Sequence, residues 1–351
     1  MTFRSVLFGS LVAILGTASA VPTLAAGGLT GQERAEAAGK GLIGSPAPRM
    51  VLKTIDGQQI DLGSLYGKQA VYLKFWATWC VPCREQMPHF ERTFESAGPD
   101  LAVIAINAGF NDSLADVQTY RTKLGIKMPI VIDDGKLGEA FNLRVTPQHI
   151  IIGRDGRIQY VGHLANDQLD AALVATRTAS PSGVATGNAA VAADAHEYKV
   201  GDRLPQLAVT TLDGQQFQFR SPQVKQRTVL VFLSPWCESY LATSRPGLAA
   251  DCREMREKAD ALAGKLNARW LGVASGLWAS RSELAAYRDQ HKVTIPLTLD
   301  DSGELFRRFR VMTVPTVLVA DEHGKIIRRL EGHAADAPSA LEGAVGATKK
   351  L

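Results

Sequence analysis

The chain has 351 residues, of which 46% are hydrophobic and 21% are charged. This length predicts about two domains, and the balanced composition excludes a disordered chain, a fibre and a polytopic membrane protein. The net charge of +4 comes from 39 basic and 35 acidic residues without a basic block, so no nucleic-acid partner is expected. Four cysteines are too few for a disulfide-rich scaffold.

Residues 1–20 have the features of a secretory signal peptide. Arg4 precedes an apolar stretch over Ser5–Gly16, and Ala18-Ser19-Ala20 matches a small-residue cleavage site. An uncleaved membrane anchor is the alternative, because the apolar run through Ala26 is just long enough to span a bilayer. Both interpretations place the rest of the chain outside the cytosol, in the periplasm, where thiols can be oxidised.

An internal duplication follows. Three motifs recur 157 residues later: Gly44 as Gly201, Asp56-Gly57-Gln58-Gln59 as Asp213-Gly214-Gln215-Gln216, and Trp79-Cys80 as Trp236-Cys237. One spacing shared by three motifs is typical of a repeated domain. Pro147 and Pro315 also correspond, but they lie 168 residues apart, so the second copy contains an insertion.

The duplication divides the chain into segments. We expect domains over residues 42–178 and 198–347. Residues 179–197 are rich in Ala, Ser and Gly, which is typical of a flexible linker. Residues 21–41 have a similar composition and are predicted to be a flexible N-terminal segment.

The first copy alternates strands and helices. The expected elements are a turn at Asp56-Gly57, a strand over Val71–Trp76, a helix from Cys80 through Phe94, a strand over Leu101–Ile106, a helix over Leu114–Leu124, a strand over Ile130–Ile132, a helix over Leu137–Leu143, and strands over Ile150–Ile152 and Ile158–Val161. This order predicts an α/β fold with a mainly parallel sheet, an antiparallel edge hairpin and flanking helices. The second copy repeats it over Val229–Leu233 and Val317–Leu330.

Two cysteines begin the first predicted helix. Cys80-Val81-Pro82-Cys83 directly follows a strand, and a C-x-x-C motif in this setting indicates redox chemistry. Amide groups at the start of a helix favour a negative charge, so we expect a lowered pKa for Cys80, which would be the attacking thiolate. Cys83 lies one turn later and would resolve the mixed disulfide. A structural zinc site is disfavoured, because a second ligand pair is missing from the sequence.

The segment Phe75–Glu85 resembles the active site of the extracytoplasmic thioredoxin-like proteins of the TlpA/ResA group, which are AhpC/TSA redoxins. Thr146-Pro147 resembles the cis-proline of that family, which lies opposite the cysteines, and Asp155-Gly156-Arg157 resembles its last hairpin. The resemblance covers about residues 42–178. It implies a thioredoxin-like fold, thiol–disulfide exchange with protein substrates, and a role for Thr146 in docking an extended substrate segment.

One position departs from the pattern. Thioredoxin itself has a buried aspartate six residues before the first cysteine, where this chain has Lys74. We expect the stem of Lys74 to pack along the sheet while its ammonium group reaches water. An inward ammonium group, which would stabilise a cysteine thiolate, is the alternative. Glu85 is expected to be a charged residue on the helix surface rather than an acid–base group.

The second copy lacks a compact C-x-x-C motif. Tyr240 occupies the position that corresponds to Cys83, yet Cys252-Arg253-Glu254 repeats Cys83-Arg84-Glu85. We therefore place an insertion, Glu238–Asp251, between the two halves of the motif. In one continuous helix the two Cα atoms would lie about 22 Å apart, which no disulfide can bridge. A break near Ser244–Gly247 would let the chain fold back, so a Cys237–Cys252 bridge, either redox-active or structural, is predicted ahead of two free thiols.

Two other functions stay open. Ser234-Pro235-Trp236-Cys237 fits the spacing of a peroxiredoxin site, with Arg310 as its activating arginine, although Leu230 replaces the proline expected before that motif. His149, two residues after Pro147, could complete a copper site with Cys80 and Cys83.

The sequence thus predicts two thioredoxin-like domains in tandem and an extracytoplasmic thiol–disulfide oxidoreductase, which the resemblance favours as a reductase. The predicted site residues are Cys80, Cys83, Thr146, Pro147, Cys237 and Cys252. The leading interpretation requires neither a cofactor nor a metal. Its partners are protein thiols or disulfides and a membrane electron donor.

Overall fold

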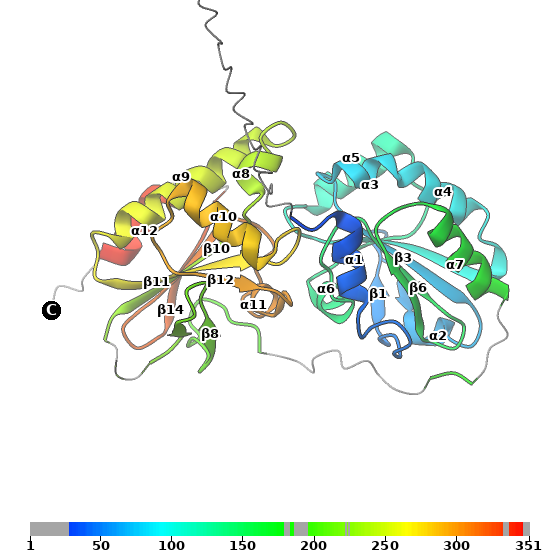
Figure 1. Ribbon diagram of the computed structural model, residues 1–351, viewed down its shortest axis with the longest axis horizontal. Helices are drawn as coiled ribbons and strands as arrows, with labels where there is room; N and C mark the ends of the chain where they lie inside the picture. Colours follow the sequence, from blue (N-terminus) through cyan, green and yellow to red (C-terminus); the bar gives the residue numbers. More distant parts are fainter. Residues whose placement is uncertain are drawn as a thin grey trace, which may run out of the picture.

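The computed structural model describes residues 28–178, 183–185, 196–221, 223, 225–332 and 337–346. The predicted signal peptide and most of the predicted linker lie outside these residues. Among the residues described, no helix combines the length and the apolar character needed to span a bilayer. The chain forms two five-stranded sheets, each with its own helices, which lie side by side (Figure 1).

The first domain follows the predicted order of elements. In chain order these are α1 (Gly31–Gly39), β1 (Val51–Lys53), β2 (Gln59–Asp61), α2 (Leu62–Leu65), β3 (Ala70–Trp76), α3 (Val81–Glu85), α4 (Met87–Glu95), the 3-10 helix η1 (Gly98–Asp100), β4 (Leu101–Asn107), α5 (Leu114–Leu124), β5 (Ile130–Ile132), α6 (Lys136–Ala140), β6 (Gln148–Ile152), β7 (Ile158–Gly162) and α7 (Asp167–Thr178). The sheet order is β5-β4-β3-β6-β7. Strands β3, β4 and β5 are parallel, and β6 and β7 form the antiparallel edge.

The second domain repeats this architecture. Its elements are β8 (Ala208–Thr210), β9 (Gln216–Gln218), β10 (Arg227–Leu233), α8 (Cys237–Tyr240), α9 (Pro246–Ala263), β11 (Ala268–Ser275), α10 (Arg281–His291), β12 (Leu297–Asp300), α11 (Glu304–Arg308), β13 (Thr316–Ala320), β14 (Ile326–Glu331) and α12 (Ala337–Gly346). The sheet order, β12-β11-β10-β13-β14, matches that of the first domain strand for strand. The predicted sheet with an antiparallel edge hairpin, flanked by helices, is confirmed in both copies.

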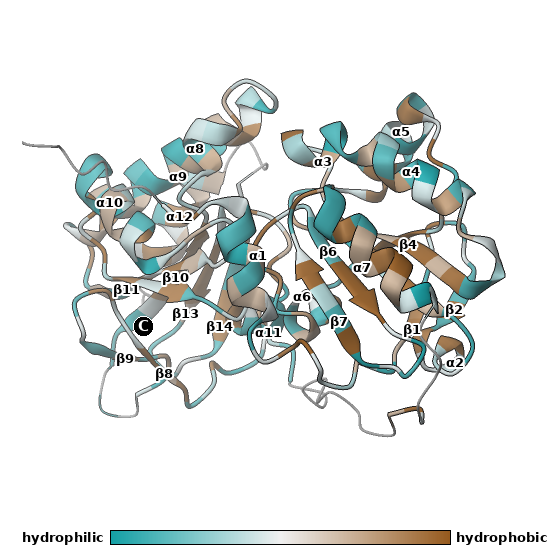
Figure 2. Cartoon of the chain, turned by 45° about the vertical axis from the view of Figure 1, so that its right-hand side comes forward, coloured by the Kyte–Doolittle hydropathy of each residue, from teal (hydrophilic) through white to brown (hydrophobic). Residues whose placement is uncertain are grey.

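Strand β3 is the centre of the first sheet, and all seven of its residues are buried. Side chains alternate between the two faces of a strand. Tyr72 and Trp76 therefore belong to the cluster that also contains Cys83 and Phe90, whereas Phe75 packs into a separate cluster. In Figure 2 the central strands of both domains are mostly hydrophobic, whereas helices such as α1, α4 and α9 carry many hydrophilic residues.

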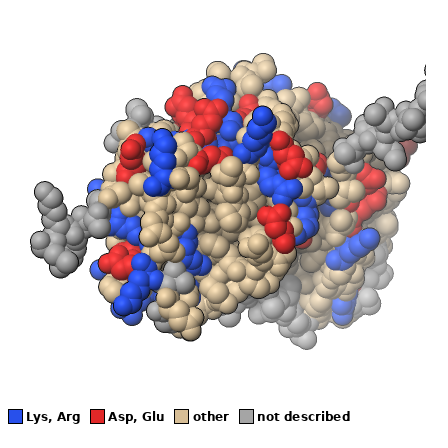
Figure 3. Space-filling view, turned by 60° about the vertical axis from the view of Figure 1, so that its left-hand side comes forward, with Lys and Arg blue, Asp and Glu red and all other residues tan. Residues whose placement is uncertain are grey.

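Charges are mixed on the surface. Acidic and basic side chains are interspersed on the face that the second domain presents in Figure 3.

The helix at Leu114–Leu124 has the predicted bounds. Ser113 and Asp116 form a capping box at its start, and Gly125 ends it in the left-handed conformation, with φ of 65°. These local signals act within a few residues, which is why this helix could be placed from sequence.

The continuous helix predicted from Cys80 through Phe94 is wrong. Helix α3 ends at Glu85 and α4 begins at Met87. Pro88 has no amide hydrogen for the next intrahelical bond, so the helix is interrupted at this point.

The flexible segment predicted over residues 21–41 is wrong over residues 31–39, which form α1, whereas residues 21–27 lie outside the described residues. Thr30 and Glu33 form a capping box, and α1 packs against β7 with Arg34, Ala35 and Ala38 buried. The alanines that suggested a linker are strong helix formers, and their small side chains allow close packing.

The prediction that the Lys74 ammonium group reaches water is wrong as well. Lys74 is fully buried, and its Nζ has no hydrogen-bond partner in the structure. It lies 5.2 Å from the centre of the Phe90 ring, on the face that helix α4 covers. The side chain of a lysine on a central strand cannot reach solvent when helices cover both faces of the sheet. Burial lowers the pKa of Lys74 from its ordinary 10.5 to about 7.

Lys74→Met removes this group with little change in volume. Between about pH 7 and 10.5 the unfolded chain binds a proton at Lys74 that the folded chain does not, so the free energy of unfolding rises with pH across this window. We expect a slope of up to about 1 kcal/mol per pH unit that Lys74→Met lacks. Urea denaturation between pH 7 and 10 measures it, with the exposed Lys68→Met as control. Parallel profiles for wild type and Lys74→Met would contradict the assignment.

Candidate active site

Cys80 and Cys83 form a disulfide at the start of α3, with their Cα atoms 5.2 Å apart. Cys80 is the N-cap residue of the helix, and the Cys83 amide donates a hydrogen bond of 3.1 Å to Cys80 Sγ. In the reduced protein this N–H group would stabilise a thiolate on Cys80, in the way that N-cap side chains accept from helix amides. Within the described chain, Cys80 and Cys83 are only 1% and 0% exposed.

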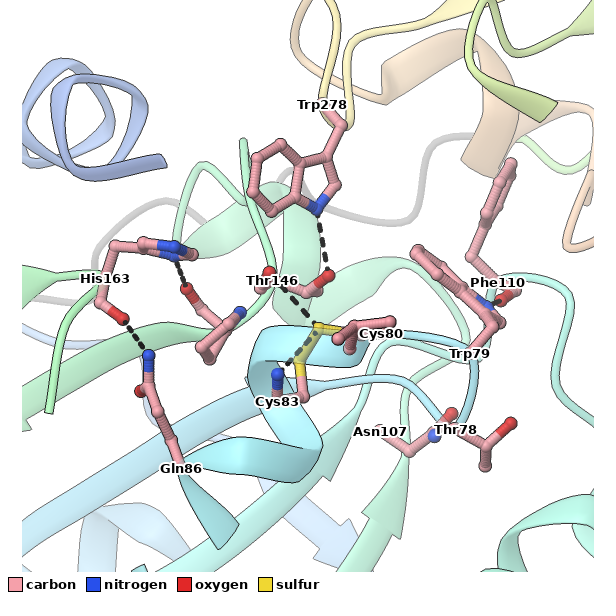
Figure 4. Close-up of a disulfide and its surroundings, with 12 residues drawn as sticks. Thr78, Trp79, Cys80, Cys83, Gln86, Asn107, Phe110, Thr146, His163 and Trp278 are labelled. Atoms are coloured by element: carbon pink, nitrogen blue, oxygen red, sulfur yellow. Dashed lines mark hydrogen bonds between the residues drawn. A yellow bond between two sulfur atoms is a disulfide. The ribbon is translucent and has the colours of Figure 1, made fainter. Parts of the chain in front are cut away.

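The strand that begins with the cis-proline lies beside this disulfide. The Thr146–Pro147 peptide bond is cis, and Pro147 leads directly into β6. Cys80 Sγ lies 3.3 Å from the Thr146 carbonyl oxygen (Figure 4). The structure thus brings Cys80, Cys83, Thr146 and Pro147 together, as the sequence predicted.

Asp112 holds the loop that precedes Cys80, and sequence reasoning missed it. The Asp112 carboxylate is fully buried and accepts hydrogen bonds from the amide and hydroxyl of Thr78, at 2.8 and 2.6 Å. It also accepts from the Asn107 side chain at 2.8 Å. The polar residues at the end of β4 were the signal that could have indicated this role, because they follow a buried strand next to the one that precedes Cys80.

A buried hydrogen-bond chain joins the helix after Cys83 to the cis-proline. His149 contacts Tyr72 through Nδ1 at 2.8 Å and Gln86 through Nε2 at 2.9 Å. The Gln86 amide then donates to the His163 carbonyl, and His163 Nδ1 donates to the Pro147 carbonyl at 2.7 Å (Figure 4). This chain fixes the orientation of α3 and α4 relative to β6.

The protonation of His149 follows from its partners. Burial lowers the pKa of His149 well below its ordinary value, so the ring is neutral. A neutral imidazole has one donor and one acceptor, and here Nε2 donates to the Gln86 side-chain oxygen Oε1 while Nδ1 accepts from the Tyr72 hydroxyl.

These contacts disfavour the copper site predicted as an alternative, since both ring nitrogens of His149 have other partners. In the part of the chain that the structure describes, no three His, Cys, Asp or Glu side chains gather as a metal site would require. Glu85, the other charged residue considered near the dithiol, is exposed on α3.

The second copy contains a disulfide between Cys237 and Cys252, with Cα atoms 6.3 Å apart. Helix α8 ends at Tyr240 and α9 begins at Pro246, so the chain folds back across the insertion. The environment differs from that of the first pair. Cys237 Sγ lies 3.8 Å from the Leu248 carbonyl oxygen, an acceptor that offers no stabilisation to a thiolate.

Arg310 and Cys237, the two main residues of the peroxiredoxin alternative, both have other partners. Arg310 is largely exposed and forms an ion pair of 3.3 Å with Glu197. Cys237 is fully buried and lies in the disulfide. The Val314–Pro315 peptide bond is cis, like its counterpart in the first domain.

Known proteins resemble this chain in sequence. The thiol-disulfide oxidoreductase ResA of Halalkalibacterium halodurans is 38% identical over 117 residues, which are 33% of this chain and 65% of the relative. The protein of the same name from Bacillus thuringiensis is 32% identical over 132 residues, which are 36% of this chain and 75% of the relative. The match to the first of these therefore covers slightly less than two thirds of the relative.

A solved structure is also similar. The thiol:disulfide interchange protein, a thioredoxin family protein, from Chlorobium tepidum covers 38% of this chain and 96% of its own length, with 27% identity and a TM-score of 0.33.

The family model for AhpC/TSA matches the chain twice, over residues 43–161 and 200–329. Each match covers nearly all of one five-stranded sheet and the helices between its strands, and the first contains the C-x-x-C motif of thiol–disulfide oxidoreductases. The chain therefore belongs to the AhpC/TSA family, as two thioredoxin-like domains in tandem.

Proposed function

We propose that this protein is a thiol–disulfide oxidoreductase that reduces disulfides in other proteins outside the cytoplasm. The observation that carries the proposal is the placement of Cys80, whose sulfur accepts the Cys83 amide and lies against the carbonyl of Thr146. One side of the sulfur thus favours a thiolate, and the other side offers backbone to a substrate segment.

The reaction has two steps. The Cys80 thiolate attacks a substrate disulfide, so that a bond forms between Cys80 and one substrate sulfur while the other leaves as a thiolate. The Cys83 thiolate then attacks Cys80 Sγ, closes the Cys80–Cys83 disulfide and releases the second substrate sulfur. Two electrons pass from the protein dithiol to the substrate, and the departing thiolates take up protons from solvent.

A reductase needs a source of electrons. Once the Cys80–Cys83 disulfide has formed, a donor must return two electrons to it before another cycle. Outside the cytoplasm no reducing thiol pool is maintained, so electrons must cross the membrane. The proposed partners are therefore a membrane electron donor and protein disulfide substrates. The two relatives bear the name thiol-disulfide oxidoreductase, which supports exchange without deciding its direction.

The location outside the cytoplasm is proposed from the N-terminal sequence. The apolar stretch and the Ala18-Ser19-Ala20 site support export with cleavage after residue 20. N-terminal sequencing of the protein recovered from fractionated cells tests this proposal. A periplasmic chain that begins at Val21 would support it. A full-length chain in the membrane fraction would support the anchor instead, and a full-length cytoplasmic chain would contradict both.

For the second pair, we propose a structural role. The Cys237–Cys252 disulfide closes the insertion between α8 and α9, and Glu238 strengthens this closure through an ion pair of 2.8 Å with Arg256. A disulfide with this sequence separation stabilises a domain by roughly 3 kcal/mol through the restriction of the unfolded chain.

Substitution of the two cysteines of the first pair tests the reaction. We expect the reduced wild-type protein to reduce insulin disulfides and Cys80→Ser to fall to the uncatalysed rate, because the attacking thiolate is lost. Cys83→Ser is the matched control: it retains the first attack but should accumulate a mixed disulfide with the substrate, detectable by mass spectrometry. Undiminished activity in Cys80→Ser would rule out the mechanism.

A further inference from the structure

The dithiol site of the first domain is covered by the second domain. Thr146 is fully buried and Cys80 is 1% exposed, although a protein substrate must reach both. In Figure 4 Trp278, from the loop after β11, extends over the disulfide.

Trp278 contacts the segment that precedes the cis-proline. Its backbone amide donates to the Arg144 carbonyl at 2.9 Å, and its indole Nε1 donates to the Thr146 hydroxyl at 3.1 Å. Its ring also meets His163 edge to face, with centroids 5.6 Å apart. Arg144 and Thr146 belong to the segment before the cis-proline, whose backbone the proposed function assigns to an extended substrate segment.

The first domain makes an equivalent contact with the cis-proline segment of the second domain. Asn111, in the loop after β4, donates its amide to the Met312 carbonyl at 2.7 Å. Its side-chain oxygen accepts from the Val314 amide at 2.9 Å. Val314 precedes the cis-proline of the second domain, as Thr146 does in the first. Each domain thus places the loop after its second core strand on the cis-proline segment of the other.

Equivalent positions meet across the boundary. Trp79 and Trp236 occupy corresponding sites in the two copies, and their ring centroids lie 4.9 Å apart. Glu139 and Arg307, in α6 and α11, also correspond and form a largely buried ion pair. An interface in which a position of one copy contacts a second position of the other, and the reverse contact is also made, is isologous, as in a two-fold symmetric dimer. The contact therefore has the geometry of a specific interface.

The insertion in the second domain adds contacts that have no counterpart. The Tyr240 hydroxyl accepts the amide of Val81, the residue that follows Cys80, at 3.0 Å. Arg245 forms an ion pair of 2.8 Å with Asp112 and donates to the Thr78 hydroxyl at 2.6 Å. The segment that separates Cys237 from Cys252 thus binds both sides of the Cys80 loop.

We propose that the dithiol face of the first domain is the docking surface for the second domain, and that Trp278 and the insertion occupy the place of the protein substrate. This inference rests on the proposed function, since it assigns a regulation to the same site. Substrates react with Cys80 only while the two domains are apart, so the apparent affinity for substrate falls with the fraction of open chains.

Reversal of one charge in the Glu139–Arg307 ion pair tests whether the two domains dock in this way. Glu139→Arg or Arg307→Glu places two like charges at the interface, which should part the domains. The readout is the rate at which a maleimide–polyethylene glycol reagent alkylates Cys80 in the reduced full chain, followed by peptide mass spectrometry. We expect each single variant to react faster by about fivefold or more, the lower end of a typical coupling between two states. The double variant restores the pair and should return to the wild-type rate.

The control is Lys258→Glu, which disrupts the ion pair with Glu342 inside the second domain. It should leave the alkylation rate at the wild-type value. If a charge reversal fails to fold, as judged by circular dichroism, Trp278→Ala opens the same contact without a new charge and should also accelerate alkylation. Equal rates in wild type, the single variants and Trp278→Ala would overturn the proposal. Fast single variants that the double variant does not restore would overturn it as well.

Insulin reduction, measured in parallel, separates the two hypotheses. Alkylation that accelerates in the opened variants while no chain reduces insulin would contradict the proposed function and retain the docking. Insulin reduction with the same alkylation rate in every chain would contradict the docking and retain the function.

Discussion

Backbone groups at the two cis-proline segments set the constraint on which the rest of the structure depends. The Arg144 and Met312 carbonyls lie on the segments that lead into the cis-prolines, outside the strands, where the sheet ladder supplies no donor for them. Each finds it in the other domain, in the amides of Trp278 and Asn111. Both donor residues have a φ of 56°, an uncommon conformation outside glycine that turns these amides toward the partner segment. Burial of Cys80 is therefore coupled to contact between the domains.

Much of the fold followed from signals that act over short distances. Asp56-Gly57 indicated a hairpin, and the structure places it between β1 and β2 with Gly57 at a φ of 83°. The alternation of apolar strands with helices predicted both sheets. The failures came from tertiary packing, which sequence patterns describe poorly. Residues 31–39 have the composition of a linker, but they form a helix because they pack against β7. Lys74 was expected to extend its ammonium group into water, but α4 covers the face of the sheet on which it lies.

The candidate site could be predicted only in part, namely where short-range sequence signals determine its geometry. Cys80 and Cys83 are one turn apart, so their spacing determines their geometry, and the Cys237–Cys252 bridge followed from the duplication. Arg245 and Trp278 could not be found this way, because their contacts with the dithiol face exist only when two domains pack against each other. In the sequence the insertion only interrupts the second cysteine motif. In the structure its residues Tyr240 and Arg245 make the interface contacts that have no counterpart in the first domain.

We propose that the Cys80–Cys83 pair exchanges electrons with substrates, whereas the Cys237–Cys252 disulfide stabilises the second domain. A redox titration of the full chain in thiol–disulfide buffers, with mass-spectrometric mapping of all four cysteines, tests this proposal most directly. We expect Cys80–Cys83 to open first, as a two-electron couple, because the Cys83 amide favours the reduced form of Cys80. Cys237–Cys252 should remain closed through that transition. Opening of both pairs together, or of Cys237–Cys252 first, would contradict the assignment of a redox role to the first pair and a structural role to the second.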